Sequence, residues 1–150
     1  MIVYTPGKLI YFDPFHFKDG SHPKPKYFLV LKIIDSNVIL ASLPSSVNHL
    51  PVTQSLNHGC LEIPDACINC YIFEQGRPIT TSGWSFPLPT FLYGNWIDEF
   101  EVSILETNYS IAGVDYEIVG ELTIEELKGV INCFANSSTV KRKYRRILSQ

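Results

Sequence analysis

Long hydrophobic runs are missing from this 150-residue sequence, and charged residues make up only 18% of it. No stretch approaches the roughly eighteen apolar residues that a membrane span requires, and residues 1–9 contain no apolar core of signal-peptide length. These absences argue against a membrane protein and favour a cytoplasmic one, in which the four cysteines are expected to be reduced thiols. Internal repeats and low-complexity tracts are also missing, which argues against a solenoid and a disordered linker.

Short apolar runs rich in aromatic and β-branched residues are present instead, and ten prolines and nine glycines interrupt them. Residues 27–34 are almost continuously apolar, which predicts a central strand, and Asp35-Ser36-Asn37 predicts a tight hairpin turn after it. Residues 44–64 are polar and read as an exposed excursion. Strands are predicted at residues 8–13, 27–34, 38–43, 68–73, 90–93, 97–105 and 114–119. The pattern predicts one mainly β domain over residues 1–150, with its strands in about residues 1–120.

A helical segment is predicted over about residues 123–148. Thr123 and Glu126 match the Thr-x-x-Glu capping box, in which each side chain satisfies a free backbone N–H at the helix start. Apolar residues then follow at helical spacing: Ile124, Leu127, Val130, Ile131 and Phe134. Residues 136–138 interrupt the pattern, and Ser138 is a candidate cap for a second helix.

Basic residues are scarce until the end of the chain. Residues 1–138 contain seven basic and fifteen acidic residues, whereas residues 139–150 contain five basic residues and no acidic one. A mostly acidic body is a poor general surface for nucleic acid, but the basic end predicts a local contact for anions. The predicted nucleic-acid-binding residues are Lys141, Arg142, Lys143, Arg145 and Arg146.

Residues 7–14 (GKLIYFDP) and residues 25–31 (PKYFLVL) are two short, mostly apolar segments. They are similar to the opening strand and the second strand of the MazF/PemK toxin family. Residues 39–46 (ILASLPSS) resemble the family's strand that ends in Pro-x-Thr or Pro-Thr-Ser, and the capped helix lies where the family has a terminal helix. The resemblance implies a small SH3-like antiparallel barrel, here with one or two C-terminal helices.

The resemblance also implies a homodimeric endoribonuclease of a toxin–antitoxin or defence system, which acts on single-stranded RNA and is bound by an antitoxin-like protein. In the family, an arginine before the second strand and a Thr or Ser after the third are tied to cleavage. This sequence has no arginine before Arg77. RNA cleavage needs a deprotonated 2′-hydroxyl, a protonated leaving oxygen and a stabilised phosphate charge. The predicted catalytic residues are Lys24, Lys26, Ser45, Ser46 and His49, with His16 and His22 as alternative general acids or bases.

Two other functions remain open. Because lysine lacks the bidentate fork of arginine, the missing arginine favours a non-catalytic SH3-like binding module that recognises protein or nucleic acid. The aromatic segment 84–96 then either stacks bases or packs inside the protein.

The third possibility is a zinc-stabilised structural domain, with no other cofactor expected. His58, Cys60, Cys67 and Cys70 lie within thirteen residues and have the chemistry of a tetrahedral zinc site. Against this, Cys70 falls inside the predicted strand 68–73, where a buried cysteine is simply a small apolar residue. Cys133 is expected to lie in the core.

Overall fold

The computed structural model describes residues 2–35, 38–50 and 56–150. Its strands are β1 (Lys8–Phe15), β2 (Lys24–Asp35), β3 (Val38–Ser42), β4 (Gly59–Ile63), β5 (Ile68–Phe73), β6 (Thr90–Tyr93), β7 (Asp98–Glu101) and β8 (Tyr116–Glu121). Its helices are α1 (Val102–Asn108), α2 (Ile124–Ala135) and α3 (Arg142–Leu148), with short 3-10 turns at Pro64–Ala66 and Gly94–Trp96. The predictions of a mainly β chain and of one or two C-terminal helices are confirmed, since both α2 and α3 form.

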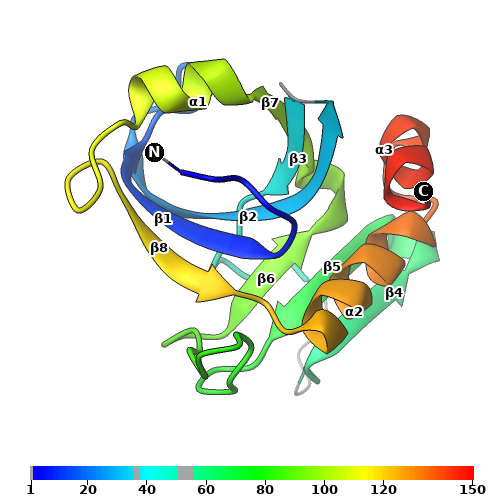
Figure 1. Cartoon of the computed structure of the whole chain (residues 1–150). Helices are drawn as coiled ribbons and strands as arrows, with labels where there is room; N and C mark the ends of the chain where they lie inside the picture. Colours follow the sequence, from blue (N-terminus) through cyan, green and yellow to red (C-terminus); the bar gives the residue numbers. More distant parts are fainter. Residues whose placement is uncertain (1, 36–37, 51–55) are drawn as a thin grey trace.

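The strands form two antiparallel sheets. Five strands follow the order β7-β3-β2-β1-β8, and three follow the order β4-β5-β6. The larger sheet is strongly curled, and α1 lies across its open side (Figure 1). Among the described residues β7 and β8 are its two edges, so the sheet does not close into a hydrogen-bonded barrel. The predicted β2–β3 hairpin is confirmed by the pairing of Asp35 with Val38, although Ser36 and Asn37 lie outside the described residues.

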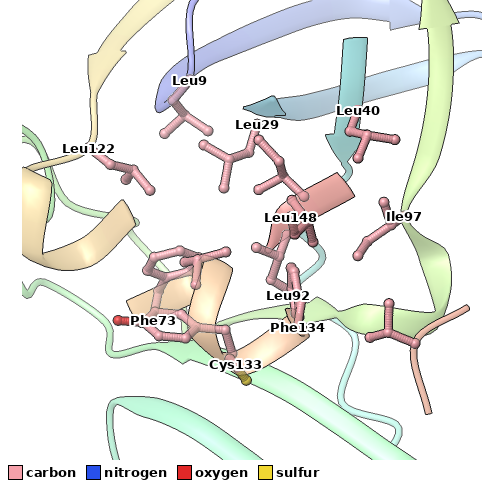
Figure 2. Close-up of a cluster of buried hydrophobic side chains, with 14 of the residues drawn as sticks. Leu9, Leu29, Leu40, Phe73, Leu92, Ile97, Leu122, Cys133, Phe134 and Leu148 are labelled. Carbon is pink, nitrogen blue, oxygen red and sulfur yellow. The ribbon is translucent and has the colours of Figure 1, made fainter. Parts of the chain in front are cut away.

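The curled sheet is buried on both faces, which explains the nearly continuous apolar run of β2. Phe28 and Val30 face the inside of the curl, together with the N-terminal segment and α1. Leu29 and Leu31 face the opposite way, toward the second sheet and the C-terminal helices. Figure 2 shows this second cluster, where Leu29 and Leu40 meet Leu92, Phe134 and Leu148.

Helix α1 was not predicted, because residues 97–105 were expected to be extended. The chain leaves the strand after Glu101 and turns into a helix. Val102, Leu105 and Tyr109 all pack into the inner cluster, and their spacing of three and four residues is helical. Strand β4 was also missed, since it lies within residues 44–64, which were expected to be an exposed excursion. Along this edge strand the exposed Cys60 and Glu62 alternate with less exposed neighbours.

The capping box forms only in part. Thr123 Oγ1 accepts a hydrogen bond from the Glu126 backbone N–H at 3.3 Å, as predicted. The return bond does not form, because the Thr123 N–H donates to the Ile79 carbonyl. The second helix begins after Lys141 and is not capped by Ser138. Its C-terminal end is held by Lys32, whose Nζ donates to the carbonyls of Ile147 and Gln150 at 2.9 Å each.

Candidate functional site

Two neighbouring depressions share Lys24 and Lys26. The large cleft, of about 780 Å³, lies between residues 15–26, the turn Gly94–Trp96, the start of β7 and Lys141. The small cleft, of about 360 Å³, lies between the start of β2, residues 44–47 and residues 86–90. Lys24 and Lys26 line both depressions, so they form the boundary between them.

The backbone of these lysines is anchored by the sheet. Lys24 pairs with Phe15 and Lys26 pairs with Phe12 on β1. Partial burial, and then the nearby Lys24 charge, lower the pKa of Lys26. Both causes disfavour the charged ammonium, so an anion bound at this boundary would be attracted by both lysines and would relieve their repulsion.

The structure brings four predicted catalytic residues to the small cleft: Lys24, Lys26, Ser45 and Ser46. Ser45 is buried, and its backbone exchanges two hydrogen bonds with Phe91. Its Oγ accepts a hydrogen bond from the Val47 N–H at 3.1 Å. The Ser45 hydroxyl therefore has a local structural role, whereas the Ser46 side chain is exposed at the rim.

The histidines have separate positions. His22 lines the large cleft beside both lysines. His49 does not line either cleft; its N–H donates to Tyr93 Oη at 2.8 Å and its ring lies 5.3 Å from that of Trp96. His16 donates its N–H to Tyr109 Oη. His22 is thus the histidine that the structure places with the lysines, although the catalytic set predicted from the sequence contained His49.

Aromatic rings make up much of the wall of the large cleft, namely Phe15, Phe17, Trp96 and Phe100. Trp96 is 45% exposed, and its ring packs against those of Tyr93 and His49. Phe86, Phe91 and Tyr93 are buried. Most rings of the predicted aromatic segment 84–96 therefore pack inside the protein, whereas Trp96 is partly exposed in the cleft.

The basic C-terminal residues occupy different positions relative to the large cleft. Lys141 lines the large cleft. Lys143 Nζ instead lies 2.5 Å from Glu99 Oε1, and Arg145 is partly buried beside the inward-facing Tyr144. Arg142 and Arg146 are exposed but do not line the cleft. Of the five predicted residues, the structure thus brings Lys141 to the candidate site.

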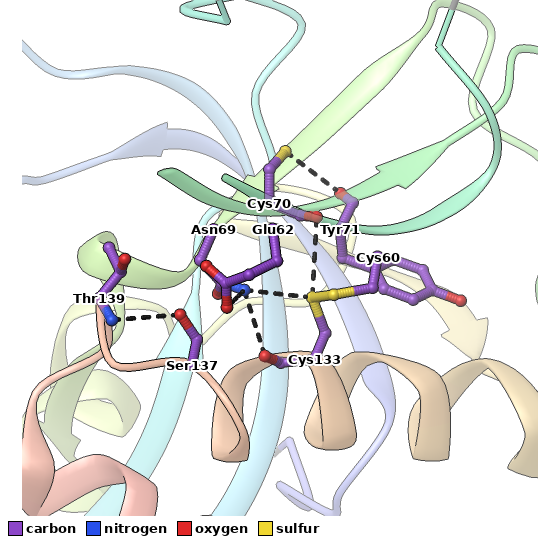
Figure 3. The surroundings of a disulfide bond; sticks show 8 residues. All are labelled: Cys60, Glu62, Asn69, Cys70, Tyr71, Cys133, Ser137 and Thr139. Atoms are coloured by element: carbon purple, nitrogen blue, oxygen red, sulfur yellow. Dashed lines mark hydrogen bonds between the residues drawn. A yellow bond between two sulfur atoms is a disulfide. The ribbon is translucent and has the colours of Figure 1, made fainter. Parts of the chain in front are cut away.

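The predicted zinc ligands are not brought together. Cys60 is joined to Cys133 in a disulfide that links β4 to α2 (Figure 3), so the expectation of four reduced thiols is wrong for this structure. Cys70 is buried on the other face of β5, because it pairs with Leu61 whereas Cys60 pairs with Tyr71. Cys67 is exposed at the turn after Pro64–Ala66. In the part of the chain that the structure describes, no three His, Cys, Asp or Glu side chains are grouped so that they could hold a metal ion.

His58 belongs to a different cluster, which the sequence did not reveal. Its Nε2 lies 2.7 Å from Glu126 Oε1, and Tyr71 Oη donates to Glu126 Oε2 at 2.7 Å. His58 Nδ1 accepts the Glu74 N–H, which assigns the ring proton to Nε2. Burial, and then the bond to Glu126, raise the pKa of Tyr71. These contacts explain why the Glu126 carboxylate does not complete the capping box.

Comparison of the chain with protein-family models, with curated proteins and with solved structures gives no match. Among the described residues, no helix is long and apolar enough to span a membrane.

Proposed function

We propose that this chain is a cytoplasmic MazF/PemK-like toxin that binds and cleaves single-stranded RNA across Lys24 and Lys26. The observation that carries the proposal is the shared boundary: the same two lysines line a cleft with hydroxyl groups and a cleft with aromatic rings and His22. A single strand needs cations for its phosphates and flat rings for its unpaired bases, and both are present side by side.

The curled five-stranded sheet supports the proposed SH3-like architecture, although its edges are not joined. The proposal also includes a homodimer and an antitoxin-like partner, which follow from the family resemblance. Light scattering of the purified chain would test the dimer.

Cleavage would use the neighbouring 2′-hydroxyl as the internal nucleophile. His22 would take the proton from this hydroxyl, the 2′-oxygen would attack phosphorus, and the bond to the 5′-oxygen would break. Lys26 would return a proton to the leaving 5′-oxygen, since its lowered pKa makes its ammonium a stronger acid than that of an ordinary lysine. Lys24 would stabilise the charge on the phosphate.

The first prediction concerns the two lysines. In Lys24→Ala or Lys26→Ala, binding to a fluorescein-labelled single-stranded RNA should weaken similarly for all sequences, and the salt dependence of log K should fall by about 0.7 per lost phosphate contact. Cleavage should slow about 100-fold or more. The control is Lys128→Ala, which removes an exposed lysine from α2. Unchanged binding in both cleft variants would contradict the proposed site.

Expression of the chain alone in a bacterial host tests the toxin reading. Growth arrest with fragmented RNA is expected for the parent chain, and normal growth for His22→Ala. Normal growth with intact RNA in the parent would end the enzyme proposal.

The second candidate function is a binding module that does not cleave RNA. Two observations favour it: no arginine is among the described residues that line the two clefts, and the Ser45 hydroxyl is already engaged by Val47. RNA binding that depends on Lys24 and Lys26, without any cleavage of the bound RNA, would identify this alternative.

A further inference from the structure

An exposed ion pair lines the large cleft at the start of β7. Lys18 Nζ lies 3.3 Å from Asp98 Oδ2, and both side chains are about half exposed, at 52% and 48%. Asp98 Oδ1 accepts the Glu99 N–H at 2.8 Å. Lys18 Nζ also donates to the Glu99 carbonyl and lies 4.3 Å from the centre of the Phe100 ring. The pair is therefore held in a defined position against β7.

The hydrogen-bonding capacity of this pair is not used up. An ammonium has three donors, and Lys18 uses one for Asp98 and one for Glu99. A carboxylate has about four acceptor sites, and Asp98 receives Lys18 and the Glu99 N–H. This count leaves one donor of Lys18 and two acceptor sites of Asp98 without a hydrogen-bond partner among the described residues.

We infer that the large cleft selects guanine, with the Lys18–Asp98 pair as the residues that read the base. The Watson–Crick edge of guanine carries one acceptor, O6, beside two donors, N1–H and the 2-amino group. Lys18 would donate to O6, and the Asp98 carboxylate would accept both donors. This inference rests on the proposed function, since it requires RNA in the cleft.

The other bases fit the pair less well. Adenine and cytosine offer a single amino donor on this edge, and uracil offers one N–H between two acceptors. Each of these bases would leave one acceptor site of Asp98 opposite another acceptor or without a partner. A site built for hydrogen bonds discriminates against such a base, because its own polar groups are left unpaired. Trp96, which lines the same cleft and is 45% exposed, would stack the selected base.

Asp19, the other aspartate in the cleft, is not equivalent. Its Oδ1 accepts from both the backbone N–H and the hydroxyl of Ser21, at 2.8 and 2.5 Å. Among the described residues Asp19 makes no ion pair with a lysine, so no ammonium lies beside it to donate to O6. Asp98 is therefore the aspartate in the cleft that is paired with a cationic donor.

The test uses nine-residue oligouridines with guanosine, inosine or adenosine at the central position, and measures affinity by fluorescence anisotropy with the full chain. Guanosine should bind about 10- to 100-fold more tightly than adenosine, as expected for a bidentate contact. Inosine lacks only the 2-amino group and should fall between them. Asp98→Asn should remove most of the preference, while Asp65→Asn, with the same charge change on an exposed residue outside the cleft, should retain it.

The ratio of affinities is the readout, because a lost negative charge strengthens binding to every RNA. Lys18→Ala provides a second variant and should also reduce the ratio. Equal affinity of the parent chain for all three oligonucleotides, or a preference unchanged in both variants, would overturn the inference and leave the RNA-binding proposal standing. Absence of binding to every oligonucleotide would overturn the proposed function and the guanine site with it.

Discussion

Gly94 lies at a point where backbone and side chains from three parts of the chain meet. A Cβ atom at this position would lie 2.1 Å from Asn69 Oδ1 and 2.8 Å from Val140 Cγ2. Both neighbours are buried, and Asn69 Nδ2 donates to the Cys133 carbonyl at 3.1 Å. No side chain fits at position 94. Gly94 therefore sets the distance between the turn at Gly94–Trp96 and β5.

Gly94→Ala should therefore lower the free energy of unfolding by about 2 kcal/mol, because neither buried neighbour has room to move. Urea denaturation followed by tryptophan fluorescence measures this loss. The control is Asn95→Ala at the next, exposed position, which should change stability by less than about 0.5 kcal/mol. Equal stability of the two variants would show that Asn69 can shift without cost.

Single residues also show what a sequence pattern can and cannot assign. The spacing of Thr123 and Glu126 correctly predicted the start of α2, since the cap depends on residues three apart. It was wrong about the Glu126 carboxylate, which the capping box assigned to the Thr123 N–H. Its partners, His58 and Tyr71, are 68 and 55 residues away. The packing of α2 on β4 and β5 brings them together.

At the scale of elements, local patterns best predicted the strands and helices whose apolar spacing is visible within their own residues. The β2–β3 hairpin and the two C-terminal helices were found in this way. Helix α1 was missed because it has only seven residues, too few for a clear helical period beside the adjoining strand. Strand β4 was missed because an edge strand with polar alternation resembles a loop in composition.

The disulfide between β4 and α2 leads to a prediction for these elements. Purified without reductant, the folded chain should show two free thiols, those of Cys67 and Cys70, after denaturation and thiol titration. Cys60→Ser should lower the free energy of unfolding by about 4 kcal/mol, because the bond closes a loop across 73 positions.

Cys67→Ser is the matched control, since Cys67 is exposed and unbonded, and it should leave stability unchanged. Four titratable thiols in the isolated protein would contradict the bond. That result would fit a reducing cytoplasm, in which such bonds are rare.

At the scale of the whole molecule, the candidate site joins residues that no local pattern connects. Lys26, Trp96 and Lys141 reach the large cleft from β2, the turn before β7 and the segment between α2 and α3. Lys24, Lys26, Ser45 and Ser46 all reach the small cleft, because the first pair begins β2 and the second pair follows its neighbour β3. The sequence grouped these four residues through the family resemblance alone. It could not show which basic C-terminal residue turns toward the cleft, because that depends on how α3 packs.

The buried and partly buried tyrosines predict how the whole fold responds to alkaline pH. Burial is the leading cause that raises the pKa of six tyrosines, Tyr4, Tyr27, Tyr71, Tyr93, Tyr109 and Tyr144. Burial also raises the pKa of the Cys70 thiol to about 12. In the unfolded chain these groups ionise near their ordinary values, about 8.5 for cysteine and 10 for tyrosine. Above those values the unfolded state has lost protons that the folded state retains.

Stability should therefore be constant up to about pH 8 with respect to these groups and fall at higher pH. Each group that stays protonated only in the folded state contributes about 1.4 kcal/mol of loss per pH unit. Lys26 acts in the opposite direction, since its lowered pKa lets the folded state lose that proton first, but it is one group against seven. Urea unfolding between pH 7 and 11 measures the slope, which Tyr71→Phe should make less steep. If the free energy of unfolding does not decline between pH 9 and 11, the prediction is wrong. These side chains would then ionise as readily in the folded protein as in the unfolded chain.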